Sequence, residues 1–180
     1  MGNSKLFTPV TFGPLTLRNR TIRSAAFESM CPGNAPSDML LDYHRSVAAG
    51  GIGMTTVAYA AVTRSGLSFD RQLWMRPEII PGLRKLTDAI HAEGAATGIQ
   101  LGHCGNMSHK SICGCTPVGA SGGFNLYSPT FVRGLRADEL PEMARAYGRS
   151  VNLAREAGFD AVEIHAGHGY LISQFLSPST

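Results

Sequence analysis

The sequence has few charged residues and lacks long apolar runs. Charged residues make up 16% of the chain, compared with about 25% in an average soluble domain. The 16 lysines and arginines are scattered and the formal net charge is only +3, so no basic groove indicates a nucleic-acid partner. No run approaches the roughly 18 apolar residues of a membrane span, and the first residues lack the apolar core of a signal peptide. These absences predict a cytoplasmic protein without nucleic-acid or membrane partners.

Cysteine is also scarce. The four cysteines are Cys31, Cys104, Cys113 and Cys115. Because nothing indicates secretion, we expect reduced thiols, and Cys113-x-Cys115 is too close for an easy disulfide within one strand. A structural zinc site would gather the last three cysteines with His103 and His109, but their spacing matches no paired C-x2-C arrangement. We therefore predict no metal in this segment.

What remains is a globular composition. The chain has 180 residues, of which 43% are hydrophobic, and its mean hydropathy is close to zero. These values exclude a disordered, coiled-coil or collagen-like chain. The length fits one domain or part of a larger one.

A unit of helix, glycine stop and short β-rich run occurs three times. The first helix is capped by Ser37 and Asp38, the second opens at Pro77, and the third follows Asp138. The predicted stops are Gly50, Gly94 and Gly158, and the strands that follow are residues 53–58, 96–101 and 160–165. An earlier strand over residues 21–27 completes four, and residues 11–17 are typical of a hairpin.

The order of these units predicts a parallel sheet, because each strand must return to the same end before the next begins. The longer second interval places an insertion at residues 102–136, after a strand. Such a sheet belongs to an open doubly wound fold or to an eight-stranded barrel. Alternation in the last strand puts Ala161, Glu163 and His165 on one face, and a polar inner face favours the barrel. The fold class is thus α/β, with four of the eight strands of a (β/α)8 TIM barrel present in residues 1–180.

Chemistry-bearing residues follow the fourth strand. If the chain turns helically there, His165 and His168 lie on one side and donate jointly to one oxygen, which would polarise a substrate carbonyl. Tyr170 could then deliver a proton as a general acid. Two alternatives stay open at this point. The histidines could be plain loop residues, or they could bind a hydrolytic zinc with Glu163, His103 or a cysteine.

Two other features are less specific. The amide of Gln100 ends the third strand and can both donate and accept, as the edge of a flavin or nucleobase requires. Glu163 could simply pair with an interior Lys or Arg. The glycine-rich residues 119–123 match no phosphate-binding pattern, and we interpret them as a mobile active-site lid.

Several blocks together resemble the Old Yellow Enzyme family of NADH:flavin oxidoreductases. These blocks are Leu6-Phe7-Thr8-Pro9, Leu17-Arg18-Asn19-Arg20, Arg23-Ser24-Ala25-Ala26-Phe27-Glu28, Gly98-Ile99-Gln100-Leu101-Gly102-His103, and the run from Ala157 through Glu163-Ile164-His165-Ala166-Gly167-His168-Gly169-Tyr170-Leu171 to Gln174-Phe175-Leu176-Ser177-Pro178. The resemblance runs nearly end to end. It implies a barrel that holds FMN at the carboxyl ends of its strands, with the N-terminal hairpin closing the floor. Reduced NAD(P)H would pass a hydride through FMN to an α,β-unsaturated carbonyl substrate.

The resemblance also assigns roles. Ala25 and Ala26 are expected against the flavin through their backbone, Ala58 and Tyr59 beside it, and Gln100 on its pyrimidine edge. His165 and His168 would hold the substrate carbonyl or a nicotinamide amide, and Tyr170 would supply the proton. No role carries over to Phe27, Cys104, Cys113 or Cys115.

The family's chain continues past the Leu-Ser-Pro block into a second half barrel that holds the FMN phosphate. We therefore expect the sequence to be a truncated half barrel with weak FMN binding, whose open edges pair with a second copy or with a complementing C-terminal half. The rival hypothesis is a non-catalytic half barrel that pairs through these edges.

Overall fold

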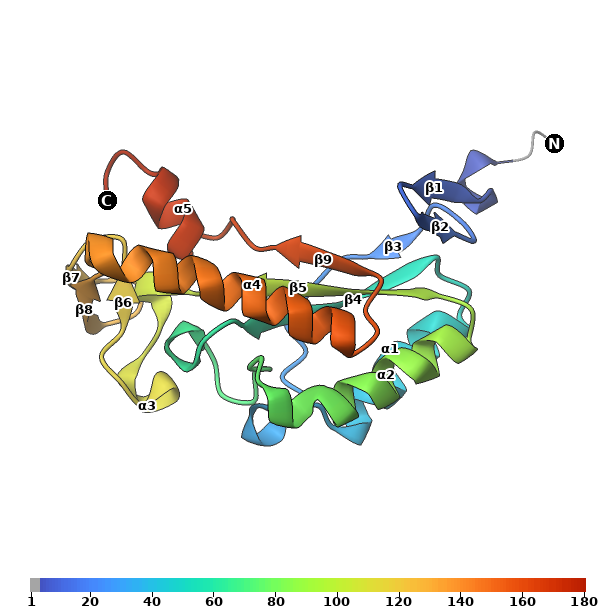
Figure 1. Cartoon of the computed structure of the whole chain (residues 1–180), viewed down its shortest axis with the longest axis horizontal. Coiled ribbons are helices and arrows are strands. Elements are labelled where there is room, and N and C mark those ends of the chain that lie inside the picture. The colour runs from blue at the N-terminus through green and yellow to red at the C-terminus, as the bar shows by residue number, and fades with distance from the viewer. Residues whose placement is uncertain (1–3) are drawn as a thin grey trace.

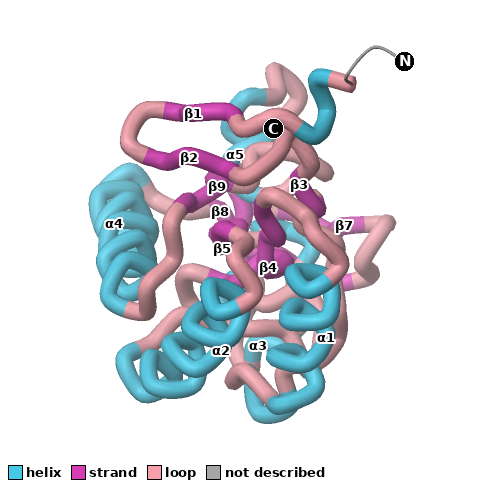
Figure 2. The backbone as a smooth tube through the Cα atoms, turned by 90° about the vertical axis from the view of Figure 1, so that its right-hand side faces the viewer, coloured by secondary structure: helices cyan, strands magenta, loops and turns pink. Residues whose placement is uncertain are grey.

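A four-stranded parallel sheet organises the chain. The computed structural model describes residues 4–180, so the first three residues of the N-terminal segment considered above lie outside it. The strand order is β3 (Ile22–Arg23), β4 (Met54–Ala61), β5 (Ala96–Gly102) and β9 (Ala161–Ile164). Every neighbouring pair is parallel, as the repeating units predict. Figure 1 shows the long α4 beside this sheet, and Figure 2 shows helices α1, α2 and α4 curving around one side of it.

The three crossover helices are α1 (Asp38–Ala49), α2 (Ile80–Ala92) and α4 (Leu140–Glu156). The Oγ of Ser37 accepts a hydrogen bond from the amide of Leu40 at 3.2 Å, which confirms the predicted cap of the first helix. Pro77 opens a single 3-10 turn directly before α2. Gly94 and Gly158, after α2 and α4, have positive φ values of 75° and 90°, which favour glycine at helix ends. The predicted helices are thus confirmed.

The core lies between the sheet and these helices. Its fully buried side chains include Leu40, Leu83, Leu86, Ile90 and Ile99. They come from the helical stripes and from the outward face of β5. Helices that cover one side of a parallel sheet (Figure 2) are the arrangement of a barrel.

The strand boundaries differ from the prediction at two places. β4 continues to Ala61 rather than ending at Ala58, and a register shift lies between Val57 and Ala60. β3 has only two residues instead of seven. After Arg23 the chain leaves the sheet, and Ser29 takes a positive φ of 56°. A period-two pattern cannot reveal this, because the segment stays extended while its ladder bonds end.

The N-terminal hairpin is formed by β1 (Val10–Phe12) and β2 (Leu15–Leu17), with Gly13 at φ 54° in the turn. The guanidinium of Arg18 follows it and donates to the carbonyls of Ala48, Ile52 and Glu93. Two of these acceptors lie at helix carboxyl ends, where a cation is favourable. Arg18 therefore fastens the hairpin to the amino end of the sheet.

The insertion over residues 102–136 is folded. It holds α3 (Lys110–Cys113) and a small sheet in which β6 (Val118–Gly119) and β7 (Gly123–Asn125) both pair with β8 (Thr130–Gly134). The glycine-rich segment interpreted as a lid begins in β6 with Gly119 and ends in β7 with Gly123, and residues 120–122 connect the two strands. The last helix, α5 (Leu171–Leu176), follows β9. No helix in residues 4–180 combines the length and the apolar character needed to cross a membrane.

Candidate active site

A cavity of about 230 Å³ lies beside the carboxyl ends of β4, β5 and β9. All eight residues predicted for the site line it, together with two phenylalanines. The lining residues are Ala25, Ala26, Phe27, Ala58, Tyr59, Phe69, Gln100, His165, His168 and Tyr170. The topology explains the gathering, because the carboxyl ends of parallel strands share one edge.

The histidine pair differs from the predicted geometry. The chain does not turn helically after β9, and His168 instead has a positive φ of 59°. This turn brings His168 Nδ1 to 3.0 Å from His165 Nε2, so the two rings hydrogen-bond to each other. His165 is buried and His168 is exposed. In this structure the two rings therefore do not both point at one oxygen, as the predicted joint donation requires.

The mutual bond limits what the pair can offer. One ring nitrogen donates and the other accepts, so a neutral pair keeps one free N–H and one free lone pair for a ligand. Two free N–H groups require an additional proton. Burial and the neighbouring His168 lower the pKa of His165, although Glu163 raises it to a lesser degree. A pair without that additional proton acts as a single hydrogen-bond donor.

Two tyrosines complete this wall. The ring of Tyr170 lies 5.0 Å from that of His165 and 6.0 Å from that of His168, measured between ring centroids. Burial raises the pKa of Tyr170, so its phenol stays protonated at neutral pH. Tyr59 packs against Tyr170 at 5.4 Å, while its hydroxyl donates to the Gly66 carbonyl. Tyr170 is thus the phenol available for proton transfer.

The opposite wall is small and amide-rich. Ala25, Ala26 and Ala58 bring no side chain beyond Cβ, and the N–H groups of Ala25 and Ala26 donate to no backbone carbonyl in the described part of the chain. Gln100 Nε2 donates to Glu163 Oε1 at 2.6 Å, which leaves its second N–H and its carbonyl free. The expected Lys or Arg partner of Glu163 is absent from residues 4–180. Free amides beside small side chains fit a flat heteroaromatic ring such as that of FMN.

A buried charge network behind this wall was missed from the sequence. Glu28 lies 2.9 Å from Arg23 Nη1 and 3.3 Å from His44 Nε2, and all three side chains are largely buried. The Glu28 carboxylate also accepts from the Ala58 amide at 3.2 Å. Arg23 donates to the carbonyl of Ala26. The network therefore fixes the backbone of two cavity-lining residues, and only the nearness of Arg23 and Glu28 in sequence hinted at it.

An aromatic pair was also missed. The rings of Phe27 and Phe69 stack with centroids 4.8 Å apart and planes 25° apart. They are 44% and 49% exposed, so they form an open apolar rim on the cavity. Phe69 follows β4 in a loop with no local signal, whereas Phe27 stands between Ala26 and Glu28 in a block already tied to the site.

The zinc alternatives find no support. In the part of the chain that the structure describes, no three His, Cys, Asp or Glu side chains converge as metal ligands. Two of the candidate ligands already have hydrogen-bond partners: His103 Nδ1 accepts from the Gly105 amide, and the Cys104 thiol donates to the Leu67 carbonyl. Cys31, Cys104, Cys113 and Cys115 are all free thiols.

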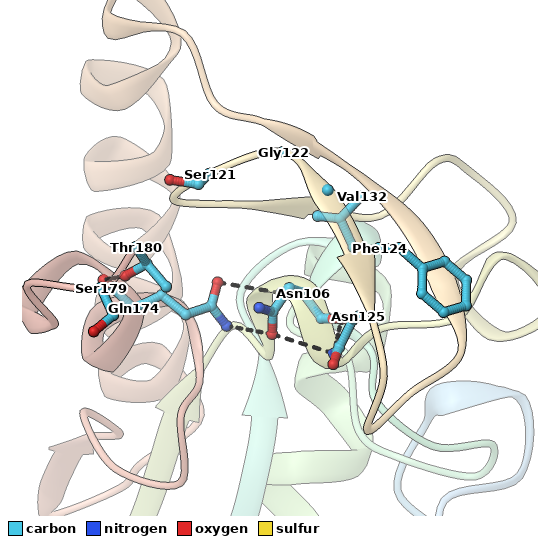
Figure 3. A pocket seen from close by; sticks show the side chains of 10 residues that line it. Asn106, Ser121, Gly122, Phe124, Asn125, Val132, Gln174, Ser179 and Thr180 are labelled. Atoms are coloured by element: carbon cyan, nitrogen blue, oxygen red, sulfur yellow. Dashed lines mark hydrogen bonds between the residues drawn. The ribbon is translucent and has the colours of Figure 1, made fainter.

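Gln174 joins the last helix to the insertion. Figure 3 shows its side chain reaching Asn106 in a second cavity of about 190 Å³. Its Nε2 donates to Asn106 Oδ1 at 2.9 Å and to the Gly169 carbonyl at 2.6 Å. Because Gly169 follows His168 directly, this buried amide helps to hold the turn that positions the histidine pair.

The fold and the cavity define one half of an α/β barrel with its site at the carboxyl ends of the strands. The model of the NADH:flavin oxidoreductase / NADH oxidase family matches residues 5–180. The chain belongs to this family, and the resemblance to Old Yellow Enzyme is confirmed.

Individual relatives agree. The chain is 42% identical over 174 residues to the 4,4'-dithiodibutanoate disulfide reductase of Rhodococcus erythropolis, covering 97% of the chain and 43% of that protein. It is 37% identical over 182 residues to a Listeria monocytogenes NADPH dehydrogenase, covering 98% and 52%. The old yellow enzyme homologue of Zymomonas mobilis superposes with a TM-score of 0.90 at 26% identity, over 98% of the chain and 52% of that structure. The chain thus spans about half the length of the relatives it matches.

Proposed function

We propose that the chain supplies the substrate-binding half of an FMN-dependent oxidoreductase that passes a hydride from NAD(P)H to a small α,β-unsaturated carbonyl compound. The observation that carries the proposal is the single cavity in which amide, imidazole and phenol groups meet. When bound, FMN supplies the hydride chemistry. Residues Ala25, Ala26, Ala58, Tyr59 and Gln100 would hold it, through free amides, small side chains and one carboxamide.

The substrate oxygen would take the free N–H of the pair formed by His165 and His168. This hydrogen bond stabilises negative charge on the oxygen as the carbonyl becomes polarised. Tyr170 holds its proton because burial raises its pKa, and it donates the proton to the substrate carbon that needs it. The Phe27 and Phe69 rim would cover the apolar part of the substrate and exclude water.

Two binding and rate measurements test this proposal. The chain is titrated with FMN and followed by flavin fluorescence, with Gln100→Leu as the variant that lacks the free amide. We expect weaker binding by the variant. In protein that reduces an enone, Tyr170→Phe should slow enone reduction by about a hundredfold or more while reduction of the flavin by NADH keeps its rate. Equal FMN affinity in both chains, or an unchanged enone rate in Tyr170→Phe, would refute the assignment.

A disulfide is a second acceptor to examine, because the relative at 42% identity is named a disulfide reductase. Comparing cyclohexenone with 4,4'-dithiodibutanoate at equal concentration gives the preferred class. A replacement of His165 and His168 by Asn should slow the enone selectively, since a disulfide has no carbonyl for the imidazole N–H to polarise. Equal losses for both acceptors would mean that the pair does not act on a carbonyl.

The partner we propose is a second half barrel. β3 and β9 are the outer strands of the sheet and each pairs on one side only within residues 4–180. Unpaired edges favour addition of further strands. Light scattering with and without the complementing C-terminal half of a family member distinguishes a homo-oligomer from a complementation complex. A stable monomer that ignores the added half would refute this partner.

A further inference from the structure

Cys113 and Cys115 form a close thiol pair outside the active site. Their Sγ atoms lie 3.5 Å apart, with the Cys115 thiol directed at Cys113 Sγ. The two residues do not share a strand, which removes the objection raised from their spacing. Cys113 ends α3, and Gly114 turns the chain back with φ 71° and ψ 9°, a left-handed conformation that favours glycine.

The two thiols have different environments. Cys113 is 1% exposed and its thiol donates to the Cys115 carbonyl at 3.2 Å. Cys115 is exposed. An exposed thiol that meets a solution reagent first, next to a buried thiol within reach of it, is the arrangement of an attacking and a resolving cysteine.

We propose that Cys113 and Cys115 are a redox-active dithiol that a low-molecular-weight disulfide converts reversibly into an intramolecular disulfide. The Cys115 thiolate attacks one sulfur of the reagent, forms a mixed disulfide and releases the first reduced thiol. The Cys113 thiolate then attacks Cys115 Sγ and releases the second. Two protein thiols are oxidised, the reagent disulfide is reduced to two thiols, and the protons pass to these products.

The geometry leaves a short path to the bond. Disulfide sulfurs lie about 2.05 Å apart, so the two sulfur atoms approach by roughly 1.5 Å. Gly114 is exposed, and a Cβ there would lie 3.0 Å from Arg64 Nη2. The turn at Gly114 thus lies next to Arg64, which begins the 3-10 turn Arg64–Gly66. Neither Gly114 nor Arg64 lines the cavity that holds the histidine pair.

The other two cysteines serve as internal controls. Cys31 and Cys104 are 4% and 0% exposed, and burial raises the pKa of each thiol to about 12. Trypsin cleaves after Lys110 and Arg133, so residues 111–133 form one peptide that holds both members of the pair. Cys31 and Cys104 fall in other peptides, and the mass of this one peptide therefore reports on the pair alone.

The experiment treats the folded chain with oxidised glutathione, blocks remaining thiols and measures the peptide of residues 111–133 by mass spectrometry. In the wild-type chain we expect a peptide lighter by two hydrogen atoms, without a glutathione adduct, that dithiothreitol restores. Cys113→Ser should accumulate a stable glutathione adduct on Cys115, because the resolving thiol is gone. Cys115→Ser should not react, because Cys113 is buried.

Two results would overturn the proposal. One is a glutathione adduct on the wild-type peptide as abundant as that on Cys113→Ser, which would mean that Cys113 does not attack. The other is a disulfide from Cys115 to another chain with Cys113 still free. Circular dichroism of each variant before treatment separates these outcomes from a folding defect.

Discussion

His103 should make the chain lose stability in mild acid. The ring is fully buried, and Gly105 N–H donates to Nδ1 at 3.0 Å while Nε2 lies 3.0 Å from Ser65 Oγ. Nδ1 therefore accepts and only Nε2 carries a proton. Burial lowers the pKa of this histidine from 6.5 to about 4, which corresponds to about 3 kcal/mol.

The direction follows from proton counting. At a pH between 6.5, the usual pKa of histidine, and about 4, its pKa in the folded chain, the unfolded chain binds a proton at His103 that the folded chain does not bind. The free energy of unfolding therefore falls as the pH falls. The neutral His103 ring makes its full contribution to the free energy of unfolding above about pH 6.5. About 2 kcal/mol of it is lost between about pH 7 and about pH 5, and the rest as the pH passes about 4.

Urea unfolding at a series of pH values measures the effect. His103→Asn keeps an acceptor for the Gly105 amide but does not titrate. Between pH 7 and pH 5 its free energy of unfolding should therefore fall by about 2 kcal/mol less than that of the wild type. Ser65→Ala is the matched control, because it removes the hydroxyl beside Nε2 while His103 still titrates. Its pH slope should equal that of the wild type. Equal slopes for His103→Asn and wild type would refute the reasoning.

Three further substitutions test the contacts that support the site. Glu28→Gln removes the carboxylate facing Arg23 and should lower the free energy of unfolding by about 3 kcal/mol or more, measured by urea titration; the Arg23→Met double variant should recover part of this loss. Gly102→Ala places a Cβ 2.8 Å from the ring of Tyr59 and should cost about 1–3 kcal/mol, with weaker FMN binding in fluorescence titration. Gln174→Ala leaves buried carbonyls without their amide partner and should cost about 1–3 kcal/mol, with faster hydrogen exchange in the insertion as the specific sign.

The helices could be predicted because their signals are local. Ser37 as a cap, Pro77 at an opening and glycine at the stops each act within one turn of chain. The length of β3 could not be predicted in the same way. The side chain of Arg23, the last residue of β3, donates to the Thr56 carbonyl at 2.6 Å, a contact 33 residues away that no short window contains.

The same distinction applies to the site. Parallel topology alone brings Gln100 and His165 to one edge, so their meeting could be predicted once the strands were counted. The orientation of His168 depends on a left-handed turn, which residue types do not specify. His44 was missed because its role exists only through Glu28, which reaches it across the space between α1 and the sheet.

The positions of the charged groups separate two kinds of pH dependence. The cavity itself holds neutral donors, since the pKa of His165 is lowered and that of Tyr170 is raised by burial. A neutral imidazole pair can give one hydrogen bond to a carbonyl, and because it carries no charge it does not attract an anionic group into the cavity. The lowered pKa of His103 acts instead on folding, from a position fully enclosed by protein. Acid should therefore unfold the chain through His103 while the phenol of Tyr170 keeps its proton. A stability curve and an activity curve that coincide at every pH would contradict this separation.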